Sequence, residues 1–179
     1  MGKQEILLNK NWIFSRKEPQ GRTENETVCL PHTVKLTPAN SSGCRNFQGI
    51  CRYGKSVYMP KEYKGKKLFL RFDGAMGAAV LYINGREISR HFCGYTPFVT
   101  DITDFVNYGA ENRLYITLDN SDDPLIPPGR PQFKLDFSYD GGLYRSAVLT
   151  VCEPLYVTDP LLANEKAGGG LFVWYTDVS

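Results

Sequence analysis

Short runs in which apolar and polar residues alternate dominate this chain. The runs that repeat this period of two most clearly are 68–72, 79–83, 114–118 and 147–151. A period of two places every second side chain on the same face of an extended backbone, so these runs are predicted β-strands. The segments 28–30 and 53–59 are further strand candidates.

Turn residues separate these runs. Asn84 and Gly85 stand between 79–83 and an alternating run at 86–89, which predicts a hairpin because both central residues of a type I′ turn need a positive φ. The segment 101–107 is expected to form one short turn capped by Asp101 or Thr103. The chain contains 17 glycines and 11 prolines, which break it at about every strand length. Many short strands joined by turns predict an all-β sandwich or jelly roll.

Three long segments, 31–49, 119–134 and 164–170, lack any such period. Loops of this length in a compact domain are usually either functional or disordered. The second contains four prolines between Pro124 and Pro131, which lower the entropy lost on fixing one shape. It leads directly to Asp136.

The chain changes character near residue 153. We expect residues 1–153 to form one domain and residues 154–179 to contain the first strands of a second, truncated β-domain. A new strand and turn are expected at 156–160, and a further strand is expected to begin within 168–179. The alternative is that the last strand folds back as an edge strand of the first domain.

Composition excludes several classes of function. The net charge is +2 with scattered basic residues, which does not indicate a nucleic-acid partner. No apolar run approaches the roughly 20 residues of a membrane-spanning helix. The five cysteines include no C-x-x-C pair, so no zinc site is expected, and a Cys44–Cys51 bridge stays open. The compartment stays open between the cytoplasm and a periplasmic or secreted location.

The segment 135–149 concentrates the candidate chemistry. Carboxylates accept hydrogen bonds from sugar hydroxyls, and aromatic rings stack on the C–H faces of sugars. We therefore expect carbohydrate binding by Asp136, Phe137 and Tyr139, with Asn46 as a further polar candidate. Phe137 and Tyr144 are also expected to point inward, so that each has an even chance of touching a ligand. The chain has no Gly-x-Ser-x-Gly motif of serine nucleophiles and no His-Glu-x-x-His motif of metalloproteases. No catalytic residue is therefore expected.

The remaining polar residues of this segment are expected to shape a turn. Asp140 precedes the double glycine Gly141-Gly142, a combination that turns prefer. Arg145 is expected to form a buried ion pair that fixes the turn. A glycosidase-type carboxylate pair of Asp136 and Asp140 is the less favoured interpretation.

A series of motifs resembles the N-terminal sugar-binding domain of glycoside hydrolase family 2, the β-galactosidase and β-glucuronidase family. The resemblance covers roughly residues 5–153. It departs from the family at Val34, which replaces a tryptophan. The matching motifs are LNKNWIF at 8–14, VCLPHT at 28–33, GICRYGKSVY at 49–58, FDGAMGAAVLYING at 72–85, GYTPFVTDIT at 94–103, GAENRL at 109–114, DN at 119–120 and GGLYR at 141–145.

This resemblance implies a jelly-roll sandwich of the galactose-binding type, followed by the start of an immunoglobulin-like domain. It implies a full-length retaining exo-glycosidase whose two catalytic glutamates lie in a later TIM barrel, so that this chain is inactive alone. The favoured substrate is a terminal β-galactoside; glucuronic acid and mannose enzymes share the domain. The family's sugar-contacting aspartate, nine residues before the arginine of the last motif, corresponds to Asp136, and its asparagine to Asn46. Dimers or tetramers are common in the family, and some members use magnesium or sodium, for which this sequence shows no site.

Two other functions stay open at this point. The chain can be a free-standing carbohydrate-binding module with no attached enzyme. It can also be a structural or adhesion β-sandwich in which Asp136 is only a turn residue.

Overall fold

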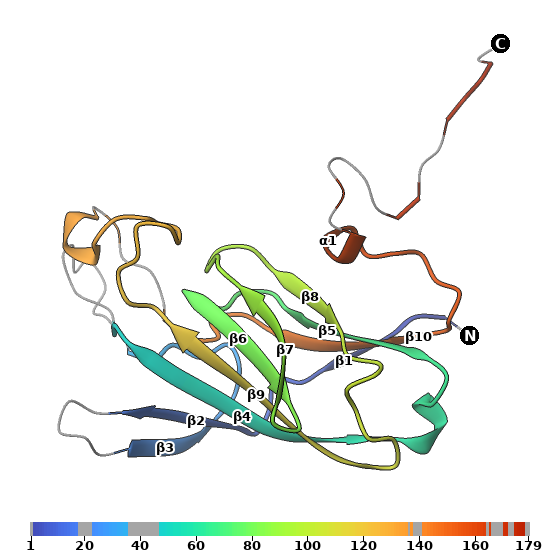
Figure 1. The fold of residues 1–179 in the computed structure, drawn as a ribbon, viewed down its shortest axis with the longest axis horizontal. Coiled ribbons are helices and arrows are strands. Elements are labelled where there is room, and N and C mark those ends of the chain that lie inside the picture. The colour runs from blue at the N-terminus through green and yellow to red at the C-terminus, as the bar shows by residue number, and fades with distance from the viewer. Residues whose placement is uncertain are drawn as a thin grey trace.

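Two antiparallel β-sheets pack face to face in the computed structural model (Figure 1). The structure describes residues 2–17, 23–35, 47–135, 137, 141–163, 165, 170–171 and 174–177. One sheet has four strands in the order β1-β10-β5-β8, and the other has six in the order β3-β2-β4-β9-β6-β7. The strands are β1 (Gln4–Leu7), β2 (Trp12–Lys17), β3 (Thr23–Val28), β4 (Ile50–Met59), β5 (Lys67–Phe72), β6 (Ala78–Ile83), β7 (Arg86–His91), β8 (Phe98–Asp101), β9 (Ala110–Asp119) and β10 (Ala147–Cys152).

The predicted alternation accounts for the core between the sheets. Every second residue of β6 and most alternate residues of β9 are buried, as a sheet with one covered face requires. Trp12 from the six-stranded sheet meets Phe72 from the four-stranded sheet, with ring centroids 6.3 Å apart. Trp12 is fully buried, and its indole N–H donates to the carbonyl of Leu8. The predicted β-sandwich is confirmed.

The hairpin between β6 and β7 has the predicted geometry. Asn84 has a φ of 52° and Gly85 a φ of 84°, the positive values that a type I′ turn needs. The predicted strand at 28–30 is wrong, because β3 ends at Val28. The pairing with β2 ends at Val28, and Leu30 donates its backbone N–H to the carbonyl of Asn9.

A buried asparagine organises the turn that precedes β9. Asn112 is 2% exposed, and its side chain makes four hydrogen bonds of 2.7–3.1 Å. Its Oδ1 accepts from the Asn107 backbone and the Asn84 side chain, and its Nδ2 donates to the carbonyls of Asn107 and Ala110. Asn112 therefore ties the β6–β7 hairpin to the chain entering β9.

Replacing Asn112 by alanine is expected to lower the free energy of unfolding by about 2–3 kcal/mol, because buried backbone groups lose their partners. Chemical denaturation measures this change. Asn107→Ala is the matched control, since the Asn107 side chain is exposed, and about 0.5 kcal/mol or less is expected there. Equal effects of the two substitutions would contradict the role of Asn112.

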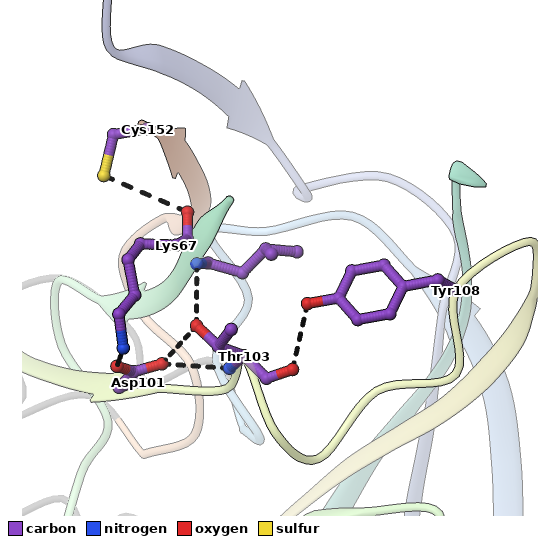
Figure 2. Close-up of polar contacts among 6 residues, drawn as sticks. Lys67, Asp101, Thr103, Tyr108 and Cys152 are labelled. Carbon is purple, nitrogen blue, oxygen red and sulfur yellow. Dashed lines mark hydrogen bonds and ion pairs between the residues drawn. The ribbon is translucent and has the colours of Figure 1, made fainter. Parts of the chain in front are cut away.

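A second polar cluster lies at the β8 edge of the four-stranded sheet (Figure 2). Asp101 Oδ1 accepts from the backbone and hydroxyl of Thr103, and its Oδ2 lies 3.0 Å from Lys67 Nζ. The Thr103 hydroxyl accepts from the Leu68 backbone N–H at 3.0 Å, and the Thr103 carbonyl accepts from the Tyr108 hydroxyl at 2.9 Å. The predicted capping by Asp101 is confirmed.

The described residues after 153 contain no strand. Residues 156–159 are irregular and α1 spans Pro160–Ala163, so the strand predicted at 156–160 is wrong. Pro160 suits the first turn of a helix, and Asp159 caps it by accepting the Leu161 backbone N–H at 2.9 Å. The boundary near residue 153 and a second domain over 154–179 stay predictions. Among the described residues, no helix is long and apolar enough to cross a membrane.

Candidate functional site

Four connecting segments leave the sandwich at the same end. The strand register pairs Ile50 and Ala78 with Asp119, Ala79 with His91, and Ala147 with Phe72. These residues lie at or next to the ends of their strands, so the connections beside them converge at one end of the sandwich. The segment after β9, drawn in orange, projects from this end (Figure 1). The converging segments, which together form what we call the site end of the sandwich, are 73–77, 92–97, 120–135 and 141–146.

The segment 141–146 is held between two neighbouring segments. Val34 and His32 donate their backbone N–H groups to the carbonyls of Gly141 and Leu143, at 3.2 and 2.9 Å. On the other side, Met76 donates to the carbonyl of Gly142 at 3.0 Å, and Asp73 to that of Ser146 at 2.9 Å. The backbone leading into β10 is thus fixed by hydrogen bonds that neighbouring segments donate to the carbonyls of Gly141, Gly142, Leu143 and Ser146.

No side chain fits at Gly142. Its φ is 89°, which costs an L-residue conformational energy, and a Cβ there would overlap the hydroxyl of Tyr53. That Cβ would also lie 3.1 Å from Val34 Cγ2 and 3.2 Å from the His32 carbonyl oxygen. The double glycine therefore allows the chain to pass directly over Tyr53.

Tyr53 and His32 form a buried pair beneath this segment. The Tyr53 side chain is fully buried on β4, and its hydroxyl lies 2.8 Å from His32 Nδ1. Phe14 packs against both rings, with centroid distances of 4.8 Å to His32 and 5.0 Å to Tyr53. The sequence gives no signal for this pair, because the contact between His32 and Tyr53 spans 21 residues and no local pattern encodes it.

The segment 120–135 is fixed at its base by Asp122. The Asp122 Oδ1 atom accepts from the Gln48 side chain at 2.5 Å and from the Gln132 backbone at 3.0 Å. Asn120 is 7% exposed; its Oδ1 accepts from the Gly49 backbone at 3.1 Å, and its Nδ2 donates to the Phe47 carbonyl. Both ends of the chain around residue 136 are therefore anchored, at Gln132–Lys134 (η2) and at Gly141.

Four of the predicted site residues, Asn46, Asp136, Tyr139 and Asp140, lie outside the described residues. Phe137 is 51% exposed, so its predicted inward orientation is wrong. This ring is open to a ligand, and its role in sugar binding stays a prediction.

Arg145 does not form the predicted buried ion pair. Its side chain is exposed, and no ion pair joins it to another described residue. The guanidinium lies over the ring of Tyr144 at 5.6 Å, and the Tyr144 hydroxyl donates to the carbonyl of Gly94 at 2.6 Å. The Tyr144 ring packs on Gly74 and so takes the inner position. The Arg145 guanidinium is left in solvent, where its charge is less costly than in the protein interior.

The described residues provide no metal or disulfide site. Among them, no three His, Cys, Asp or Glu side chains are placed to hold a metal ion, so no chemistry is assigned to magnesium or sodium in this part of the chain. Cys51 is a free thiol, and burial raises its pKa to about 12. The Cys44–Cys51 bridge that the sequence left open is therefore absent at Cys51; Cys44 lies outside the described residues.

Acid is expected to destabilise the domain through its two histidines. Burial lowers the pKa of His32, partly offset by Glu26, and burial also lowers the pKa of His91. A histidine with a lowered folded-state pKa binds its proton more readily when unfolded. Stability is thus complete above the ordinary pKa of about 6.5 and is lost as the pH falls toward the lowered value.

Denaturation at about pH 7.5 and about pH 5.5 measures this loss. The double variant His32→Asn, His91→Asn is the control, and it should show a smaller change in unfolding free energy over the same interval. An equal change in the variant would assign the acid sensitivity to other groups.

Comparison with known proteins identifies the family. Residues 34–152 match the model of the glycosyl hydrolases family 2 sugar binding domain. This chain belongs to glycoside hydrolase family 2. The matched residues include β4 to β10, Tyr53 and the four converging segments, whereas Phe14 and His32 precede the match. The family assignment and most of the geometry therefore concern the same part of the molecule.

Relatives of this glycoside hydrolase family 2 domain bear two kinds of name. A β-glucuronidase of Bacteroides fragilis is 38% identical over 84% of this chain and 21% of the relative. A β-galactosidase of Thermoanaerobacter pseudethanolicus is 29% identical over 93% of this chain and 23% of the relative. The crystal structure of a putative β-galactosidase from Bacteroides fragilis superposes with a TM-score of 0.75 at 29% identity, over 86% of this chain and 24% of that chain. The chain spans about a fifth of the length of the curated relatives it matches.

Proposed function

We propose that this domain is the N-terminal, non-catalytic part of a larger retaining exo-glycosidase, and that its site end contributes residues to the sugar subsite. The membership in glycoside hydrolase family 2 supports the reaction class. The fraction of the relatives that the chain covers supports a catalytic domain elsewhere in the full-length protein. We expect the chain alone to hydrolyse no glycoside.

The anchored site end is the observation that carries the proposed sugar contact. The chain is fixed by Asp122 before residue 136 and by four backbone hydrogen bonds after residue 140. A loop with fixed anchors loses less conformational entropy when a ligand binds. This matters for a sugar ligand, because each hydroxyl contact contributes little binding free energy. Asp136 is adjacent in sequence to Phe137, whose ring is half exposed, so a hydroxyl acceptor and a stacking surface occur together.

Terminal β-glucuronides and terminal β-galactosides are the two candidate substrate classes. The higher identity to a β-glucuronidase, 38% against 29%, favours a glucuronide. A galactoside is the second candidate, favoured by the superposition at a TM-score of 0.75 on a protein named a putative β-galactosidase. The sequence motifs alone favoured a galactoside.

Hydrolysis of paired nitrophenyl substrates tests this proposal. The full-length protein should release nitrophenol from the β-D-glucuronide or the β-D-galactoside, with one at least about 100-fold better than the other in kcat/KM. The β-D-mannoside serves as a third substrate. If the folded full-length protein hydrolyses none of them, the glycosidase proposal fails and a binding module or adhesion domain becomes the better account.

A second domain over 154–179 belongs to the same proposal. Several large apolar side chains of this segment are strongly exposed, which is costly unless another part of the protein covers them. They are Leu155 at 93%, Val157 at 69%, Leu171 at 79%, Trp174 at 79% and Tyr175 at 82%. In the full-length protein these residues should be protected from solvent in hydrogen-exchange mass spectrometry; exchange at the rate of an unfolded chain would contradict a domain here.

A further inference from the structure

Two hydrogen bonds and one close approach tie His32 and Tyr53 to the segment 141–146. The His32 backbone N–H donates to the Leu143 carbonyl at 2.9 Å. The Tyr53 hydroxyl lies 2.8 Å from His32 Nδ1, and Gly142 passes directly over the same hydroxyl.

The two side-chain partners of His32 fix the protonation and orientation of its imidazole. Glu26 Oε1 lies 3.4 Å from Nε2, and a carboxylate oxygen only accepts hydrogen bonds, so the proton of neutral His32 resides on Nε2. Nδ1 is then the acceptor for the Tyr53 hydroxyl. Two other charged or titratable groups face His32 from the elements packed against it: Arg16 on β2 and Tyr53 on β4. Arg16 opposes a positive charge on the imidazole and also donates to the Val34 carbonyl at 2.9 Å, so it braces the same segment.

We propose that Tyr53 and His32 are positioning residues that set the placement of Gly141–Arg145, and through it the sugar-binding geometry of the site end. The proposal rests on the proposed function above. Neither side chain is assigned a contact with sugar, since Tyr53 is fully buried and His32 is mostly covered. Their effect is carried by the backbone, because Gly142 passes directly over the Tyr53 hydroxyl and the Leu143 carbonyl accepts from the His32 backbone N–H.

Protonation of His32 would break this arrangement. An Nδ1–H donor facing the Tyr53 hydroxyl removes the acceptor of the buried hydroxyl proton, and an unpaired buried donor is unfavourable. The segment 141–145 should therefore be placed correctly only while His32 is neutral. Asparagine at position 32 offers an acceptor near the place of Nδ1 and does not titrate, so it separates the hydrogen bond from the charge.

Hydrogen exchange and kinetics of the full-length protein test the proposal together. Tyr53→Phe should accelerate amide exchange in peptides covering 141–146 by about tenfold and lower kcat/KM by about 10- to 100-fold. His32→Ala should act in the same direction, whereas His32→Asn should keep kcat/KM within about threefold of the wild type and remove the acid acceleration of exchange at 141–146. Tyr108→Phe is the matched control, because its hydroxyl is likewise hydrogen-bonded, to the Thr103 carbonyl, but lies at the other end of the sandwich; it should change neither readout.

The outcomes separate this inference from the proposed function. Unchanged exchange at 141–146 in Tyr53→Phe, or unchanged kcat/KM despite faster exchange, overturns the positioning role. If His32→Asn is as impaired as His32→Ala, the hydrogen bond to Nδ1 is not what positions the segment, and the inference is again overturned. Absence of any glycoside hydrolysis by the wild-type protein counts against the proposed function alone, since the exchange readout needs no substrate.

Discussion

Replacing Asp136 by asparagine in the full-length protein should lower kcat/KM for its preferred glycoside by about 30- to 1,000-fold. The resemblance to family 2 aspartates that hold sugar hydroxyls implies this role for Asp136. Charge-assisted hydrogen bonds are about twice as strong as neutral ones, and losing the charge on a group that holds two hydroxyls costs about 2–4 kcal/mol. Asparagine keeps the size of the side chain, so folding should be unaffected. Steady-state kinetics with the nitrophenyl glycoside measures the effect.

Asp140→Asn is the matched control for this substitution. Asp140 lies four residues further on and is predicted to shape the turn before the double glycine, a role that asparagine can also fill. The expected loss is therefore less than about tenfold. A pattern in which Asp140→Asn is severely impaired and Asp136→Asn is near normal would reverse the two assignments.

Substituting alanine for Gly142 should lower the free energy of unfolding by about 2–5 kcal/mol. A positive φ costs an L-residue about 1–2 kcal/mol, and overpacking a tight core site costs about 1–3 kcal/mol more. The overlap cannot relax easily, because Tyr53 is fully buried and Val34 and the His32 backbone crowd the same Cβ. Urea denaturation of the 179-residue chain provides the measurement.

Gly65→Ala separates strain from steric overlap. Gly65 has a φ of 86°, close to the 89° of Gly142, but a Cβ there meets nothing within 4 Å. Its substitution should cost only the strain, about 1–2 kcal/mol. In addition, the double variant Tyr53→Phe, Gly142→Ala should be less destabilised than the sum of the two single variants, because phenylalanine lacks the atom that alanine would strike. Equal costs at the two glycines, with additive effects in the double variant, would refute the close approach over Tyr53.

The elements that the sequence predicted well are those whose signal is local. The alternation in 79–83 and 114–118 depends only on which face of a strand is covered, and both became central strands of the six-stranded sheet. The Asn84-Gly85 turn is set by the conformational freedom of two adjacent residues, and its φ values followed. Motif resemblance added the family, which periodicity alone does not provide.

The predictions that were wrong depend on contacts between distant segments. Arg145 was expected to be buried from its place beside a glycine turn, but Tyr144 takes the space over Gly74. The Tyr53–His32 pair joins β4 to the chain after β3 across 21 residues, and nothing near either residue marks it. The strand at 156–160 failed because an alternating run forms a strand only when another strand pairs with it, and Asp159-Pro160 is also a helix start.

The crystal structure of the full-length protein with its product sugar bound would test the central claim most directly, which is that this domain helps to form the sugar subsite. We predict that a carboxylate oxygen of Asp136 lies about 2.5–3.0 Å from at least one sugar hydroxyl. We also predict that the ring of Phe137 or Tyr139 lies in contact with the sugar or its neighbouring group. A sugar bound in the full-length protein with no residue of 1–153 within about 4 Å would contradict the account.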